Sequence, residues 1–264
     1  NIVVFDFMEE TFSGKRIFIT GASKGLGATC FHELAERGAK LVISGRTQKN
    51  LEDLLSDTKE PDSHLAITSD LSEESNVHKF VQKGIEFLGG VDIIIHALGG
   101  GYGFSDPLLS WKQIDLLHKV NIYAGAEINR LALPKMIENL SGIVIHVGSI
   151  ASQEAVGSVG YNTVKAGLAA YVRSLGREMA SSGIVVTGIL PGGFTAPGNA
   201  MVRLQKNKPK IYDSFVEKRL PRKRMGSVTE IVPLILLLAS DAGSMMSGCC
   251  VPIDAGEGIS YMTE

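Results

Sequence analysis

The chain has 264 residues, which is enough to bury a sizeable core in one large domain or two small ones. Its 26 Lys and Arg residues nearly balance its 28 Asp and Glu residues, and the resulting net charge of -2 argues against a dedicated nucleic-acid binder and favours small-molecule partners. The three cysteines, Cys30, Cys249 and Cys250, are too few for a disulfide framework, and the last two would face opposite sides of a strand. We therefore expect no metal site and a reducing, cytoplasmic compartment.

No segment predicts a membrane span or a secretory signal. The longest apolar run, residues 231–239, is interrupted by Pro233 and is far shorter than the roughly 20 residues that cross a bilayer. Residues 1–7 are apolar but lack a basic n-region and a small-residue cleavage site, and Met8 is a candidate natural start. We interpret residues 1–11 as an N-terminal extension and residues 12–264 as one domain.

Short apolar runs rich in β-forming residues alternate with helical stretches along the chain. The predicted strands cover residues 16–20, 41–44, 65–68, 92–96, 143–147, 184–189 and 249–253. The predicted helices cover residues 25–38, 48–57, 73–87, 111–139, 159–182 and 229–240, with Gly38 and Gly183 at C-termini and Ser72 as an N-cap. Continuous apolar strands that alternate with helices predict an α/β fold, a doubly wound, mostly parallel seven-stranded sheet of the Rossmann type.

One long stretch, residues 192–226, breaks this alternation with glycine, proline and charged residues. Ligands of open α/β sheets bind outside the carboxyl ends of the strands. We therefore predict an irregular loop over about residues 194–225 that covers a substrate.

A glycine-rich turn follows the first predicted strand and leads into the first helix. It places Gly21, Gly25 and Gly27 where the backbone can turn tightly and approach a pyrophosphate at the helix N-terminus. The segment Thr-Gly-Ala-Ser-Lys-Gly-Leu-Gly, residues 20–27, resembles the short-chain dehydrogenase/reductase family. This resemblance extends over nearly the whole chain from about Phe12 and is nearest to 3-oxoacyl-acyl-carrier-protein reductases and related sugar or polyol dehydrogenases. The alternative is a packing turn that binds no ligand.

The second predicted strand ends without the carboxylate that would bind the ribose 2′-hydroxyl of NAD. Arg46 stands there instead, and Lys24 lies within the glycine turn, so both cations can approach a 2′-phosphate. By resemblance this combination predicts NADP(H). Either residue alone could be an ordinary surface charge.

A tyrosine and a lysine four residues apart, Tyr161 and Lys165, lie on one face of a predicted helix. A neighbouring ammonium is expected to lower the pKa of the phenol, so that Tyr161 can exchange a proton with a carbonyl oxygen. By resemblance, Lys165 also binds the nicotinamide ribose, Ser149 orients the substrate carbonyl, and Asn121 holds a water in the proton relay.

The resemblance assigns further cofactor contacts to segments that follow the other strands. Asp70 would bind near the adenine ring, although its spacing equally suits a helix N-cap. The expected cofactor-binding residues are Gly21, Ser23, Lys24, Gly25, Leu26, Gly27, Arg46, Asp70, Leu71, Ala97, Leu98, Gly99, Tyr161, Lys165, Pro191, Gly192, Phe194 and Thr195. Family members usually form homotetramers, with the helices within residues 111–139 and 159–182 at one interface and the C-terminal tail at another, and we expect the same here.

After the fourth strand the chain departs from the family's Asn-Asn-Ala-Gly, reading His96-Ala97-Leu98-Gly99. We interpret His96 as a structural replacement that hydrogen-bonds backbone between strands, and the alternative is a recruited acid or base.

Residues 201–225 carry nine basic and two acidic side chains, in a chain whose total charge is -2. Such a segment favours an anionic substrate or an acidic carrier protein, unless it is only a solvated face. We predict an NADPH-dependent enzyme that reduces a ketone or oxidises the matching secondary alcohol, acting on a 3-oxoacyl thioester or a keto-sugar or polyol. The alternative is an NADPH-binding sensor without turnover, which would have no need of Tyr161 or Ser149. An enoyl reductase or a dehydratase-epimerase relative is disfavoured.

Overall fold

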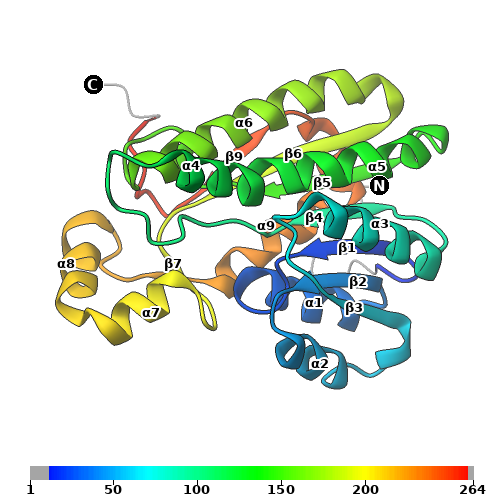
Figure 1. The fold of residues 1–264 in the computed structure, drawn as a ribbon, viewed down its shortest axis with the longest axis horizontal. Coiled ribbons are helices and arrows are strands. Elements are labelled where there is room, and N and C mark those ends of the chain that lie inside the picture. The colour runs from blue at the N-terminus through cyan, green and yellow to red at the C-terminus, as the bar shows by residue number, and fades with distance from the viewer. Residues whose placement is uncertain (1–11, 261–264) are drawn as a thin grey trace, which may run out of the picture.

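Seven parallel strands form one sheet between two helical layers in the computed structural model (Figure 1). The structure describes residues 12–260, so the predicted N-terminal extension, residues 1–11, lies outside the described residues. The strand order is β3-β2-β1-β4-β5-β6-β9, and all six neighbouring pairs are parallel. The predicted doubly wound Rossmann-type sheet is therefore confirmed.

The elements follow one another in the predicted alternation. The strands of the main sheet are β1 (Arg16–Thr20), β2 (Lys40–Gly45), β3 (His64–Thr68), β4 (Ile93–His96), β5 (Gly142–Val147), β6 (Ile184–Pro191) and β9 (Cys250–Ile253). The α-helices are α1 (Gly25–Glu36), α2 (Gln48–Ser56), α3 (Glu74–Leu88), α4 (Trp111–His118), α5 (Ala124–Glu138), α6 (Val159–Met179), α7 (Ala200–Asn207), α8 (Pro209–Arg219) and α9 (Val232–Leu238). Two short strands, β7 (Phe194–Thr195) and β8 (Gly226–Ser227), pair apart from the main sheet.

Side chains of successive strand residues enter two separate cores, one on each face of the sheet. In β1, Ile17 and Ile19 belong to the core shared with α1 and α9, whereas Phe18 belongs to the core shared with α3 and α5. The rings of Phe18 and Phe80 pack edge to face with centroids 5.3 Å apart. Burial on both faces explains why the strands read as continuous apolar runs.

The predicted helix over residues 111–139 is interrupted at its centre. A π-helical turn, Lys119–Tyr123, joins α4 to α5. The apolar spacing continues across this turn and therefore did not reveal it. A π-helical turn inserts one extra residue into the helix. The buried Asn121 lies within this turn.

The segment predicted as an irregular loop contains two helices. Asn199 caps α7 by accepting a hydrogen bond from the Val202 backbone N–H at 3.0 Å, and Pro209 occupies the first turn of α8. Neither helix has a fully buried residue, and both are rich in polar and charged side chains. We call residues 194–227, from β7 to β8, the α7–α8 arm; it projects beside the main sheet in Figure 1.

The helix termini agree with the predictions at two glycines and disagree at one serine. Gly38 and Gly183 have the positive φ values of 82° and 72° expected after a helix. Ser72 does not cap α3, because the N-cap position is Glu73 and Ser72 donates its backbone N–H to the Asp70 carboxylate instead. None of the described helices is both long enough and apolar enough to cross a membrane.

Candidate active site

The predicted ligand-binding segments all follow the carboxyl ends of strands in the main sheet. The glycine turn follows β1, Arg46 follows β2, Asp70 follows β3, and the turn at Ala97 follows β4. Ser149 and Gly192 follow β5 and β6 in the same way. Because every strand pair is parallel, these segments gather along one edge of the sheet, the edge at which open α/β folds bind ligands.

Three glycines of this edge lie where backbone segments approach one another closely. A Cβ at Gly21 would lie 2.8 Å from the Leu98 N atom, and one at Gly27 would lie 2.7 Å from the Gly21 carbonyl oxygen. A Cβ at Gly45 would lie 2.6 Å from the Cβ of Ser23. Side chains at these positions would separate the turns after β1, β2 and β4. The glycines therefore bring three strand ends together into one cradle.

The N-terminus of α1 opens onto this cradle without a side-chain cap. Lys24 occupies the N-cap position and makes no capping hydrogen bond, while Gly25 donates its N–H to the Pro197 carbonyl at 3.0 Å. First-turn N–H groups and the helix dipole favour an anion at this position. The donor set thus fits the pyrophosphate of a dinucleotide, which is the group that the glycine turn predicts.

Tyr161, Ser149 and Lys165 come together from β5 and α6. Burial raises the pKa of Tyr161, and a hydrogen bond with Ser149 opposes this shift. Lys165 is buried, its Nζ atom donates to the Val147 carbonyl at 2.9 Å, and the same atom lies 5.7 Å from the centroid of the Tyr161 ring. The structure therefore brings the predicted trio together at the end of β5.

The expectation that a cation lowers the pKa of Tyr161 is wrong for this structure. Burial is the largest influence on the pKa of the Tyr161 phenol. The ammonium of Lys165 is directed to a backbone carbonyl rather than to the phenol hydroxyl. Burial also lowers the pKa of Lys165 to about 8. Tyr161 is thus a neutral phenol at neutral pH, which can donate a proton.

Asn121 occupies the π-helical turn and holds the loop after β4. Its side-chain amide donates to the carbonyls of Gly100 at 3.0 Å and Leu117 at 2.9 Å, and its oxygen accepts from the Gly100 N–H at 3.1 Å. A Cβ at Gly99 would lie 2.8 Å from that oxygen and 3.2 Å from the Nζ atom of Lys165. Asn121, Gly99 and Lys165 are therefore immediate neighbours, and the water-holding role of Asn121 stays a prediction.

The structural interpretation of His96 is retained, but its predicted partner is wrong. Its Nε2 atom hydrogen-bonds the Asn129 side-chain oxygen at 2.9 Å instead of strand backbone. Its ring stacks on His146 with centroids 4.4 Å apart, and Asn129 also contacts Tyr171. Both histidines and Asn121 line a small cavity of about 10 Å³. Burial lowers the pKa of His96 to about 4, which leaves it neutral and unsuited to act as an acid near neutral pH.

Arg46 and Lys24 lie where the turns after β1 and β2 meet. Arg46 lies over the Tyr102 ring at 5.6 Å and contacts its hydroxyl at 3.4 Å. Burial, followed by the charges of Arg203 and Arg46, lowers the pKa of Lys24. The predicted pair is therefore assembled, and the structure adds Arg203 from α7 and Tyr102 from the loop after β4.

The remaining predicted contacts lie on both sides of the cradle. Asp70 is exposed beyond β3, where its carboxylate accepts the Ser72 N–H at 3.0 Å, while Leu71 is buried. Phe194 pairs with Gly226 in the small sheet, and the Thr195 hydroxyl donates to the Gly226 carbonyl at 3.2 Å. Thr195 thus contributes to the base of the α7–α8 arm.

A buried carboxylate that the sequence did not single out supports the segment after β6. Glu257 accepts the Gly193 N–H at 2.5 Å and lies 3.4 Å from a guanidinium nitrogen of Arg219 on α8. A Cβ at Gly192 would lie 2.7 Å from the same carboxylate. Burial raises the pKa of Glu257. No local motif marks this residue, because its role depends on the C-terminal segment returning to β6.

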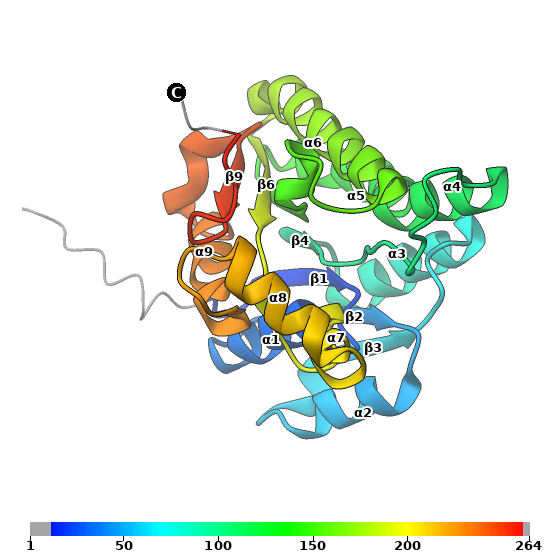
Figure 2. The same ribbon diagram turned by 90° about the vertical axis from the view of Figure 1, so that its left-hand side faces the viewer.

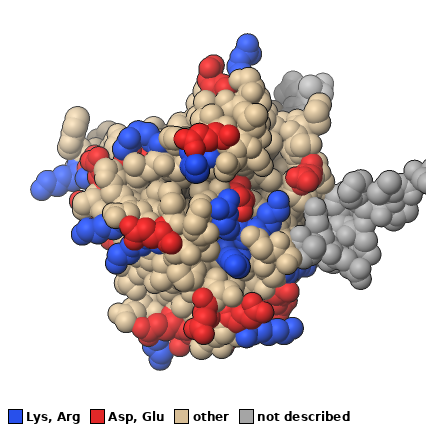
Figure 3. Space-filling model, turned by 90° about the vertical axis from the view of Figure 1, so that its right-hand side faces the viewer, with Lys and Arg blue, Asp and Glu red and all other residues tan. Residues whose placement is uncertain are grey.

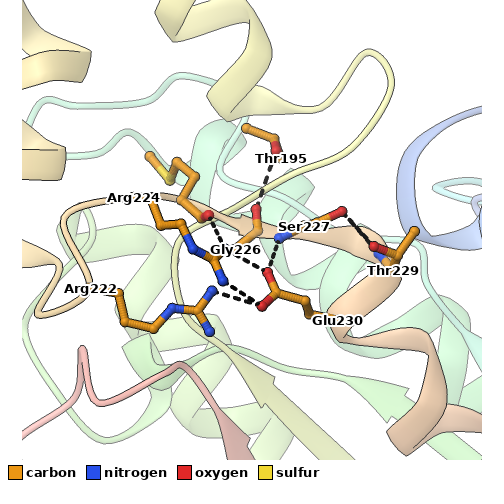
Figure 4. Close-up of polar contacts among 8 residues, drawn as sticks. Thr195, Arg222, Arg224, Gly226, Ser227, Thr229 and Glu230 are labelled. Atoms are coloured by element: carbon orange, nitrogen blue, oxygen red, sulfur yellow. Dashed lines mark hydrogen bonds and ion pairs between the residues drawn. The ribbon is translucent and has the colours of Figure 1, made fainter.

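The positive charge of the α7–α8 arm is smaller than its sequence indicated. Glu230, outside the basic segment, pairs with Arg222 at 2.7 Å and with Arg224 at 2.9 Å, and it also accepts the Ser227 N–H (Figure 4). Lys223 pairs with Glu217, also within the arm. Five cations of residues 201–225 have no carboxylate partner within residues 12–260, namely Arg203, Lys206, Lys208, Lys210 and Lys218. The opposite face of the molecule carries intermixed acidic and basic side chains (Figure 3).

Comparison with known proteins decides the family. The model of a family described as "Enoyl-(Acyl carrier protein) reductase" matches residues 21–257. The chain belongs to the short-chain dehydrogenase/reductase family. Its members are oxidoreductases that use a nicotinamide cofactor, and they include the 3-oxoacyl-acyl-carrier-protein reductases that the sequence resembles.

Individual relatives of this short-chain dehydrogenase/reductase act on different substrates. The chain is 28% identical to 1,6-dihydroxycyclohexa-2,4-diene-1-carboxylate dehydrogenase of Pseudomonas putida over 95% of each protein. It is 27% identical to the 3-oxoacyl-[acyl-carrier-protein] reductase FabG of Aquifex aeolicus, over 94% of this chain and 99% of that protein. The crystal structure of L-sorbose reductase from Gluconobacter frateurii, complexed with NADPH and L-sorbose, superposes with a TM-score of 0.86 at 25% identity, covering 95% of this chain and 98% of that one.

Proposed function

We propose that the protein is an NADPH-dependent reductase that converts a ketone to a secondary alcohol, or catalyses the reverse oxidation, with Tyr161 as the general acid or base. The observation that carries this proposal is the grouping of Tyr161, Ser149 and Lys165 beside the glycine cradle. A pure cofactor-binding protein would not need the phenol or the serine. NADPH, when bound, supplies the hydride for the carbonyl carbon.

Each residue of the site has a separate task in this proposal. Ser149 donates a hydrogen bond to the substrate carbonyl, which fixes its oxygen near Tyr161. Tyr161 then gives its hydroxyl proton to that oxygen, and its raised pKa keeps the proton available at neutral pH. Lys165 is held beside this pair by its hydrogen bond to the Val147 carbonyl, where its amine would bind the nicotinamide ribose. Asn121 holds the loop that carries Gly99 and Gly100 in place beside Lys165.

The proposed cofactor follows from charge at the adenosine end of the cradle. Arg46 and Lys24 provide two cations there, and the strand end that binds the 2′-hydroxyl of NAD through a carboxylate has none. The solved complexes of L-sorbose reductase with NADPH and of Pseudomonas aeruginosa RhlG with NADP are of the same fold. Higher affinity for NADH than for NADPH would contradict this part of the proposal.

The substrate class is proposed from the α7–α8 arm. Five cations of the arm without carboxylate partners in the described chain favour a carbonyl compound that bears a phosphate, a carboxylate or an acidic carrier. A 3-oxoacyl thioester on a carrier protein and an acidic sugar both meet this description. For such a substrate the Michaelis constant rises with ionic strength, whereas a constant value from low to physiological salt would argue for a neutral keto-sugar or polyol.

We also propose that the protein is a homotetramer that uses α4, α5 and α6 as one interface. Trp111 is 88% exposed and Leu108 is 87% exposed, and Val159 at the start of α6 is exposed as well. Apolar side chains of this size on neighbouring segments favour association. Light scattering during size-exclusion chromatography tests the assembly, and a monomer would contradict it.

The decisive test of the activity is Tyr161→Phe, measured with NADPH against a panel of 3-oxoacyl thioesters, keto-sugars and diketones. The variant keeps the ring and removes the proton donor, so turnover should fall by about 100-fold or more while NADPH affinity is retained. A matched control is Tyr171→Phe on the same helix. Turnover of Tyr161→Phe at the wild-type level would refute the assignment.

A further inference from the structure

Three cations from three separate segments meet at the adenosine end of the cradle. Lys24 belongs to the glycine turn, Arg46 follows β2, and Arg203 lies on α7. The charges of Arg203 and Arg46 both act on the Lys24 ammonium, and Arg203 has the larger effect of the two. The sequence indicated only the first two cations. Arg203 is distant in sequence and belongs to a helix that the sequence did not predict.

Backbone contacts fix where Arg203 lies relative to the glycine turn. The Pro197 carbonyl accepts the Gly25 N–H at 3.0 Å, which docks the start of the α7–α8 arm onto the N-terminus of α1. Gly198 has a φ of +68°, and a Cβ there would lie 3.2 Å from the Cδ atom of Lys24. The Arg203 guanidinium donates to the Gly198 carbonyl. Arg203 therefore contacts Gly198, which in turn packs against the aliphatic part of Lys24. Figure 2 shows α7 in front of α1 and β2.

This cluster of positive charge has no compensating carboxylate. Within residues 12–260, none of Lys24, Arg46 and Arg203 forms an ion pair. The polar partner of Arg46 is the Tyr102 hydroxyl, and that of Arg203 is a backbone carbonyl. Cations held close together without a counter-charge repel one another, and a dianion between them removes that repulsion.

The α7–α8 arm is well suited to respond to one such contact. Neither α7 nor α8 has a fully buried residue, so little apolar packing holds either helix against the sheet. The contacts around Pro197 and Gly198 join the base of the arm to the glycine turn, directly beside the cluster. A contact with Arg203 therefore acts on a helix that has no fully buried residue of its own.

We propose that Arg203 is a third ligand of the cofactor's 2′-phosphate and that this contact orders the α7–α8 arm when NADPH, but not NADH, is bound. The inference rests on the proposed function only in taking NADPH as the cofactor. It makes Arg203 a specificity-determining residue that also links the cofactor to the segment covering the substrate. NADH, which carries a hydroxyl at this position, leaves the repulsion among the three cations in place.

The test compares adenosine 2′,5′-bisphosphate with 5′-AMP, which differ only in the 2′-phosphate and cannot support turnover. Titration calorimetry gives the affinity for each, and hydrogen–deuterium exchange of residues 200–219 reports the order of the arm. In the wild-type protein the bisphosphate should slow exchange in the arm and 5′-AMP should not. Arg203→Gln should bind the bisphosphate about tenfold more weakly, with unchanged affinity for 5′-AMP, and should lose the protection of the arm.

Two control variants separate the specific contact from general charge. Lys206→Gln removes an exposed cation from the same helix and should keep both the affinity and the protection. Arg203→Lys keeps the charge without the planar donor pair, so its affinity for the bisphosphate should lie between those of wild type and Arg203→Gln. Unchanged bisphosphate affinity in Arg203→Gln, or equal protection of the arm by 5′-AMP, would overturn the proposal.

Failure of this inference can be told apart from failure of the proposed function, because neither readout needs a reaction. A protein that shows the expected bisphosphate effects but reduces no carbonyl compound would refute the reductase proposal and keep the role of Arg203. An active NADPH reductase in which the 2′-phosphate does not change hydrogen exchange of the arm would keep the reductase proposal and refute the role of Arg203.

Discussion

The buried histidine pair should make the folded protein sensitive to acid. His96 is about 5% exposed, stacks on His146 and has a folded-state pKa of about 4, whereas its ordinary value is 6.5. Because the folded-state pKa is lowered, the unfolded chain binds a proton at His96 before the folded protein does. The stabilising contribution is therefore fully present above about pH 6.5 and is lost as the pH falls towards about 4.

The size of this effect follows from the gap between the two pKa values. A gap of about 2.5 pH units, at about 1.4 kcal/mol per unit, corresponds to a loss of roughly 3 to 4 kcal/mol in the free energy of unfolding, of which about 3 kcal/mol is lost by pH 4. Burial and the neighbouring His96 lower the pKa of His146 as well, so the wild-type protein should lose more than His96 alone accounts for. Such a loss is a large fraction of the stability of a typical domain.

Urea unfolding between about pH 7 and about pH 4 measures this loss when protein concentration is held fixed. Far-UV circular dichroism is the appropriate signal, because the single tryptophan, Trp111, lies at the proposed tetramer interface and would report dissociation as well as unfolding. His96→Asn replaces the imidazole with an amide that does not titrate and should flatten the pH dependence by about 3 kcal/mol. His118→Asn, outside the buried pair, serves as the matched control. An equally steep loss of stability in His96→Asn and wild type would refute the reasoning.

Two further predictions concern the cradle and its support. Gly45→Ala places a Cβ 2.6 Å from that of Ser23 and should weaken NADPH binding about tenfold or more while retaining the fold. Calorimetry measures the affinity, and circular dichroism checks the fold. Unchanged NADPH affinity would show that the cradle tolerates the added methyl group. Glu257→Ala leaves the Gly193 N–H without its acceptor and should lower the free energy of unfolding by about 2 kcal/mol, with faster hydrogen exchange in α8. Glu257→Gln keeps an acceptor and should lose less stability. Equal losses of stability in the two variants would contradict this role of Glu257.

The parts of the fold that the sequence predicted are those that local physics determines. Strands buried on both faces need continuous apolar runs, and the first of them, β1, has the predicted bounds Arg16–Thr20. The sharp turns after helices need positive φ values, and Gly38 and Gly183 have them. The Tyr161 and Lys165 pair was found for the same reason, because one helical turn sets its geometry.

The features that were missed depend on contacts between distant segments. The helices of the α7–α8 arm have no fully buried residue, and the glycine, proline and charged residues of this segment indicated a loop. The partner of His96 is Asn129 on α5, which no strand-based argument identifies. Gly125 marks the contact in retrospect, since a Cβ there would lie 3.1 Å from the His146 ring. Only the packing of α5 against β4 and β5 connects these residues.

The error about Tyr161 shows why a motif alone does not determine the chemistry of its residues. The spacing of Tyr161 and Lys165 places both on one helical face, and from spacing alone the ammonium should favour the phenolate. The folded protein instead buries the phenol and directs the ammonium to the Val147 carbonyl. A neutral Tyr161 beside Ser149 is prepared to donate a proton rather than to accept one. Burial of a motif residue therefore has to be known before its protonation state can be assigned.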